Sequence, residues 1–118
     1  MTCTQAVNTI CKHTDDTLTR YVDITDQLAV LGAVTITSGT VDAGDSGVTV
    51  GSVTVTASEV TDVDQYGNSV TIAAGKAIQF QLSGGAAQAE SDDPYELTAA
   101  ITLSNGEIVA KTLLLRVE

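Results

Sequence analysis

Apolar residues occupy every second position over several short stretches of the chain, which is the pattern of half-buried β-strands. The clearest stretch covers residues 78–82, where Ile78, Phe80 and Leu82 alternate with two glutamines. Similar stretches lie at residues 19–24, 33–40, 48–56 and 70–74, and a weaker alternation continues to residue 63. Turn-forming residues separate them at regular intervals. This spacing predicts an all-β fold, an immunoglobulin-like antiparallel β-sandwich of about seven strands over residues 19–118.

The last two predicted strands form the strongest hairpin signal in the chain. Apolar residues share one parity on each side of Asn105-Gly106, namely Tyr95, Leu97, Ala99, Ile101 and Leu103, then Val109, Leu113, Leu115 and Val117. A two-residue Asn-Gly turn would put these two apolar sets on opposite faces. A three-residue loop at 104–106 pairs Leu103 with Glu107 and Leu97 with Leu113, so the faces agree. We therefore predict this loop, with a left-handed Gly106.

The sequence also predicts four local features, two of which are irregularities within strands. Val48 and Val50 differ in parity from the valines that follow, so Gly51-Ser52 must hold a bulge, bend or turn. Gly39 is expected to shift the phase of its strand. Residues 25–29 resemble one helical turn with Thr25 as N-cap. Tyr95 resembles a tyrosine corner, although an ordinary half-buried tyrosine fits the pattern equally well.

Residues 1–18 show no clear period and are predicted to form an arm or irregular lead-in, ordered only by neighbouring proteins. Cys3, Cys11 and His13 lie in this arm, and we predict that they contact partners, together with Tyr66 at a loop tip. The N-terminus lacks the basic start and apolar stretch of a secretory signal. We therefore expect folding in a cytoplasm, with both cysteines as reduced thiols.

Composition narrows the possible partners. Acidic residues outnumber basic ones by 15 to 5, which gives a formal charge of −10. Such a surface repels phosphate backbones and anionic membranes, so no nucleic acid and no membrane partner is expected. No apolar run approaches the roughly 18 residues of a membrane helix. With one Phe, three Tyr and no Trp, the chain offers few stacking platforms for bases or sugars.

The sequence offers no convincing catalytic or metal site. His13 is the only histidine, and it lies in a segment without a predicted scaffold, so we expect no catalytic residue. A zinc site from Cys3, Cys11 and His13 would have three ligands without standard spacing. Loop aspartates could instead gather around a cation, or could accept local backbone N–H groups. These aspartates are Asp42, Asp45, Asp62, Asp64, Asp92 and Asp93. We predict no cofactor.

The region from Asp15 to Glu118 resembles a family of small immunoglobulin-like proteins from the head and tail gene clusters of tailed bacteriophages. The resemblance rests on DDTLTRYVDITDQLA at 15–29, VTIT at 34–37, GVTV at 47–50, LSGG at 82–85, YELTAAITLSNG at 95–106 and LLLRVE at 113–118. Some members are described as fiber-tail adaptors. This chain departs from the family pattern at Thr25, where a tryptophan is expected, and in a longer hairpin between Val55 and Gln79.

The resemblance implies a non-enzymatic structural component of a tailed-phage virion, which connects or adapts tail, baseplate or neck proteins. Its partners would be other virion proteins, in a symmetric homo-oligomeric ring. The chain would be localised in the virion after folding in the host cytoplasm. Two alternatives stay open: an adhesive module that binds a host-surface glycan or protein, and a capsid decoration protein.

Overall fold

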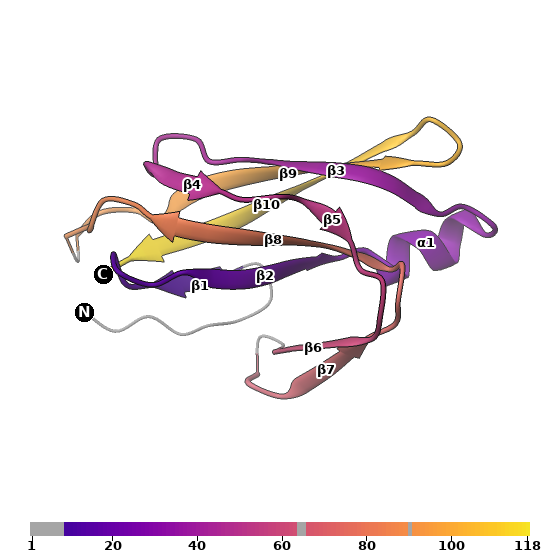
Figure 1. The fold of residues 1–118 in the computed structure, drawn as a ribbon, viewed down its shortest axis with the longest axis horizontal. Coiled ribbons are helices and arrows are strands. Elements are labelled where there is room, and N and C mark those ends of the chain that lie inside the picture. Colours follow the sequence, from indigo (N-terminus) through magenta and orange to yellow (C-terminus); the bar gives the residue numbers. More distant parts are fainter. Residues whose placement is uncertain (1–8, 64–65, 90) are drawn as a thin grey trace.

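The computed structural model describes residues 9–63, 66–89 and 91–118, and these residues form two facing β-sheets with a separate hairpin (Figure 1). The first sheet has the order β1 (Thr9–Lys12), β10 (Ile108–Val117), β9 (Tyr95–Leu103) and β3 (Ile36–Asp42). In the second sheet, β8 (Ala77–Gly84) pairs with β2 (Leu18–Asp23) on one side and with β4 (Val48–Val50) and β5 (Thr54–Val55) on the other. The all-β sandwich is therefore confirmed.

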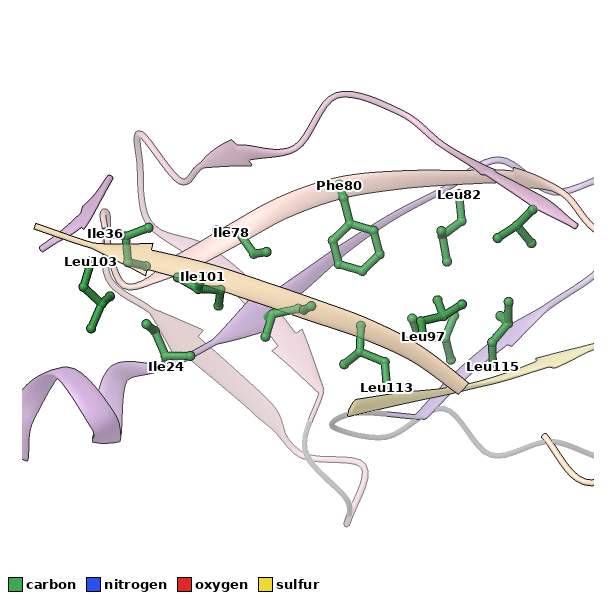
Figure 2. Close-up of a cluster of buried hydrophobic side chains, with 14 of the residues drawn as sticks. Ile24, Ile36, Ile78, Phe80, Leu82, Leu97, Ile101, Leu103, Leu113 and Leu115 are labelled. Carbon is green, nitrogen blue, oxygen red and sulfur yellow. The ribbon is translucent and has the colours of Figure 1, made fainter. Parts of the chain in front are cut away.

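The space between the sheets is filled by aliphatic side chains and one phenylalanine. Figure 2 shows side chains of β8 and β9 pointing toward one another across this space. The buried cluster comprises Ile10, Val22, Ile24, Leu28, Ile36, Val48, Ile78, Phe80, Leu82, Leu97, Ala99, Ile101, Leu103, Leu113, Leu115 and Val117. Most of these positions follow the predicted every-second-residue pattern. Burial of this apolar surface is the main force that holds the two sheets together.

The final hairpin has the predicted register. Ile101 pairs with Val109 and Leu97 with Leu113. The Leu103 N–H donates to the Glu107 carbonyl at 2.8 Å, which closes the loop over residues 104–106. Gly106 has a φ of 87°, a left-handed conformation that L side chains rarely adopt. The three-residue loop is therefore confirmed.

Two predicted strand irregularities have different outcomes. The break at Gly51-Ser52 is confirmed, because β4 and β5 pair with β8 in registers that differ by one residue. The irregularity of β3 lies between Ile36 and Ser38, so the predicted position at Gly39 is wrong. Gly39 instead marks a close approach between the sheets. A Cβ atom there would lie 2.8 Å from Cγ2 of Ile78 on β8.

The N-terminal segment differs from the expected irregular arm. Residues Thr9–Lys12 form strand β1, which pairs in parallel with β10 and buries Ile10 and Lys12. The sandwich therefore starts before the predicted boundary at residue 18, and one of its strand pairs is parallel. The expectation missed this strand because a four-residue segment with a buried lysine lacks the usual apolar alternation. Residues 1–8 lie outside the described part.

The predicted helical turn is longer than expected and begins differently. Helix α1 runs over Thr25–Leu31, and its N-cap is Ile24, so the expectation of Thr25 as N-cap is wrong. The carboxylate of Asp23 accepts hydrogen bonds from both the backbone N–H and the hydroxyl of Thr25. An aspartate one residue before the cap thus satisfies a helix N-terminal donor that a capping side chain would otherwise serve.

A two-stranded hairpin, β6 (Val60–Val63) and β7 (Ser69–Ile72), projects from one end of the sandwich (Figure 1). Its base is closed at Thr56, whose carbonyl accepts the Gly75 N–H at 2.8 Å and whose N–H donates to Ala77. Outside this hairpin, β4 and β5 both pair with the same side of β8, so the two together occupy one strand position in the second sheet. The two sheets then hold four and three strand positions, although the prediction of about seven strands counted the stretch at 70–74 in the hairpin and did not include β1.

Candidate partner-binding surface

At the end of the sandwich opposite the C-terminus, the β9–β10 hairpin reaches beyond the second sheet (Figure 1). Strand β2 ends at Asp23 and the chain turns directly into α1, which lies close to the inner face of this hairpin. Leu28 is the buried anchor of the helix. Helix α1 therefore covers part of the hairpin that sheet packing leaves open.

An open groove of about 450 Å³ remains between α1 and the hairpin. Its lining consists of Asp26, Gln27, Val30, Leu31, Glu107 and Val109. Most of the exposed lining surface is apolar, and the Val30 side chain is 86% exposed. The volume falls within the roughly 300–1,000 Å³ range of ligand pockets. The groove thus offers apolar contact area that the protein's own core does not use.

Among the described residues that line the groove, the charged ones are both acidic. Asp26 lies in the first turn of α1, and Glu107 follows the hairpin loop. Within the described part of the chain, neither carboxylate takes part in an ion pair. The groove therefore combines an apolar floor with uncompensated acidic groups.

His13 lies in the turn after β1 and is well exposed. Its Nδ1 accepts the Asp15 N–H at 3.3 Å, and its own N–H donates to the Asp16 carboxylate at 3.0 Å. The Asp15 carboxylate is 3.9 Å from Nδ1. These contacts hold a surface turn, and the described partners of His13, Asp15 and Asp16, include no nucleophilic hydroxyl or thiol. The geometry thus gives His13 a local structural role.

The prediction of reduced cysteines is wrong for Cys11, which is disulfide-bonded. Cys11 sits on β1, paired with Arg116 of β10, and not on an irregular arm. The expectation assumed that a reducing compartment would leave both thiols free, and it missed the strand that fixes the position of Cys11. Cys3, the other cysteine of the chain, lies outside the described residues.

Tyr66 lies between β6 and β7 and is 79% exposed, as expected for a loop tip. The structure thus places His13, Cys11 and Tyr66 on separate elements, and none of the three lines the groove. Whether they contact partners stays a prediction.

The loop aspartates do not form a cation cluster in the described residues, where no group of three or more potential metal ligands occurs. Asp42 accepts the Gly44 N–H at 2.8 Å, and Asp92 accepts the Ala89 N–H at 2.9 Å. Asp62 accepts the Val63 N–H at 2.8 Å. Asp42 and Asp92 thus serve the backbone of their own turns, one of the two interpretations left open by the sequence, whereas Asp62 lies on strand β6. Asp64 lies outside the described residues.

Sequence reasoning missed Lys12, the buried charged residue among those that the structure describes. Its side chain is only 1% exposed, and Nζ donates to the carbonyls of Gly84 at 2.6 Å, His13 at 2.7 Å and Thr14 at 3.4 Å. The ammonium group thereby links β1 of the first sheet to the end of β8 in the second. A lone lysine in a short polar segment gives no sequence signal for such a role.

Reasoning from sequence also missed the groove. Val30 and Leu31 lie beyond the predicted helical turn, and Glu107 and Val109 are about 80 residues further along the chain. A longer helix assignment would have shown Leu28 and Leu31 on one face, since residues three apart are neighbours on a helix. The contact with the hairpin is purely tertiary.

Two comparisons with known proteins identify no relative of this chain. A scan against protein-family models finds no matching family, and a search of curated proteins finds no match. No helix in the described ranges has the length and apolar character needed to cross a membrane. The resemblance to tailed-phage proteins therefore stays a prediction.

Proposed function

We propose that the chain is a non-enzymatic structural module of a tailed-phage virion, where it connects neighbouring proteins of the tail, baseplate or neck. The observation that carries this proposal is the open apolar groove between α1 and the β9–β10 hairpin. Exposed apolar surface with a polar rim is typical of sites that bind other proteins. The mechanism is burial of that surface against a neighbour, without covalent chemistry.

The distribution of strands supports an immunoglobulin-like domain, as the resemblance implies. In that fold, the second, fourth and fifth strands share one sheet, and the third, sixth and seventh share the other. Strands β2, β4–β5 and β8 correspond to the first set, and β3, β9 and β10 to the second. The Tyr95 hydroxyl donates to the Ala86 carbonyl at 3.3 Å, a contact like that of a tyrosine corner.

Adhesion to a host surface is the second candidate, and the projecting β6–β7 hairpin favours it. Tyr66 presents an aromatic ring at the hairpin tip, where sugar rings and proteins can be contacted. Glycan-array binding by the purified chain, abolished by Tyr66→Ser, would support adhesion over a connecting role. Absence of binding on such arrays favours the virion-internal role.

The test of the main proposal is the position of the chain in particles produced from the genome that encodes it. Quantitative mass spectrometry of purified particles should find a fixed copy number that matches a symmetric ring. Antibody labelling should place the chain at the tail, baseplate or neck. Labelling over the whole head would indicate decoration of the capsid, and absence from purified particles would contradict a virion role.

A further inference from the structure

We infer that the groove between α1 and the β9–β10 hairpin binds a segment of a partner protein that carries apolar side chains next to lysine or arginine. This inference rests on the proposed connecting function and specifies the chemistry of the partner. It follows from the packing of the groove, its charge and its open shape.

The floor of the groove is an uncovered continuation of the core. Val109 has the same parity on β10 as the buried Leu113 and Leu115, so its side chain is on the inner face of the first sheet. At this end α1, and not the second sheet, faces that surface, and it leaves Val30 and Leu31 beside the opening. Apolar side chains from a partner would extend the existing core by burying these residues.

The charge of the groove selects among apolar partners. Asp26 and Glu107 are on its lining, and none of the described lining residues is basic. The chain as a whole carries a formal charge of −10. A second copy would bring the same negative charge and be repelled, whereas a basic segment would be attracted and could pair with both carboxylates.

The shape of the groove favours a chain segment as occupant. The groove is largely open to solvent, and its lining comes from helix α1 and from residues of the β9–β10 hairpin. An enclosed pocket would surround most of a small molecule, as stable binding of such ligands requires. An open groove instead suits side chains that enter from a longer segment.

Three short synthetic peptides test this inference on the full isotope-labelled chain by NMR titration. The first carries two leucines one helical turn apart, each beside a lysine. In the second, glutamates replace the lysines, and in the third, serines replace the leucines. The first peptide should shift the amide signals of the groove lining and bind at least about tenfold more tightly than the others. Added salt should weaken the binding of the first peptide.

Matched variants locate the binding. Val30→Ser should weaken the affinity for the first peptide about fivefold or more. Ile108→Ser should change this affinity less than about twofold, because Ile108 is also exposed but lies on the outer face of β10. Glu107→Lys should weaken binding more than Glu59→Lys, which changes the net charge equally at an exposed site outside the groove.

Equal binding of the lysine and glutamate peptides, or equal effects within a variant pair, would overturn the inference. Self-association through the groove, seen as concentration-dependent shifts of the lining signals without peptide, would do the same. Presence of the chain in particles is measured independently. Failed peptide binding together with a fixed copy number in particles would reject this inference and leave the proposed function intact.

Discussion

At the scale of single residues, Lys12 shows how the two sheets are joined at one edge. Transfer of an ammonium group from water to a protein interior is costly unless its donors are satisfied. The Nζ atom has three carbonyl acceptors, with the shortest contacts to Gly84 and His13. Gly84 closes β8 of the second sheet, whereas Lys12 ends β1 of the first. The lysine therefore forms a polar link between β1, an edge strand of the first sheet, and the end of β8, the central strand of the second.

Replacement of Lys12 by methionine should lower the free energy of unfolding by about 1–3 kcal/mol, because buried carbonyls lose charged hydrogen-bond donors. Urea denaturation of the two proteins measures the difference. The control is Lys111→Met on β10, a half-buried lysine without such contacts among the described hydrogen bonds, which should cost less than about 0.5 kcal/mol. Equal effects of the two substitutions would show that the hydrogen bonds of Lys12 do not stabilise the contact between the two sheets.

Gly39 shows a second residue-scale constraint, set by the distance between sheets. Gly39→Ala should destabilise the protein by about 1–3 kcal/mol, because the added Cβ would lie 2.8 Å from Ile78 Cγ2. The substitution should cost clearly less in an Ile78→Ala background, where the neighbouring atoms are removed. Thermal and urea unfolding of the four proteins gives the coupling energy. Additive effects would contradict the close approach.

At the scale of elements, strands that are long and strictly alternating were predictable, whereas short or mixed ones were not. Strand β8 contains its predicted alternating residues 78–82, and the β9–β10 hairpin has its predicted register. Strand β1 escaped prediction because its stability comes from pairing with β10, far away in the sequence. The extent of α1 was underestimated for the same reason, since its packing under the hairpin depends on tertiary contact.

Adjacent leucines on β10 test the two-faced character of this sheet. Leu113→Ala should cost about 2–5 kcal/mol, since Leu113 is buried between the sheets. Leu114→Ala should cost less than about 1.5 kcal/mol, because this side chain is on the outer face and partly exposed. Chemical denaturation compares the two variants. A larger loss from Leu114→Ala would mean that the inner and outer faces are wrongly assigned.

At the scale of the whole molecule, the sequence predicted the sandwich but not the candidate site. Parity along each strand is a local property, so the inner faces could be identified without coordinates. The groove joins α1 to a hairpin about 80 residues away, and no local pattern encodes that contact. The residues predicted to contact partners, including His13 and Tyr66, lie on other elements. Their prediction came from exposure and residue type alone.

The β6–β7 hairpin should be separable from the sandwich. Ile72 on β7 is buried but is not part of the main core cluster, and the backbone contacts of Thr56 close the hairpin at its base. Replacement of residues 58–73 by a short turn should therefore keep the NMR spectrum of the sandwich and change the free energy of unfolding by about 2 kcal/mol or less. Loss of cooperative unfolding would show that the hairpin supports the core.

The most direct test of the connecting role is a cryo-electron microscopy reconstruction of the particle. The account predicts density for this sandwich in a symmetric ring of the tail, baseplate or neck, with a neighbouring protein seated in the groove between α1 and the β9–β10 hairpin. A reconstruction in which the chain is present but this groove faces open solvent in every copy would contradict it.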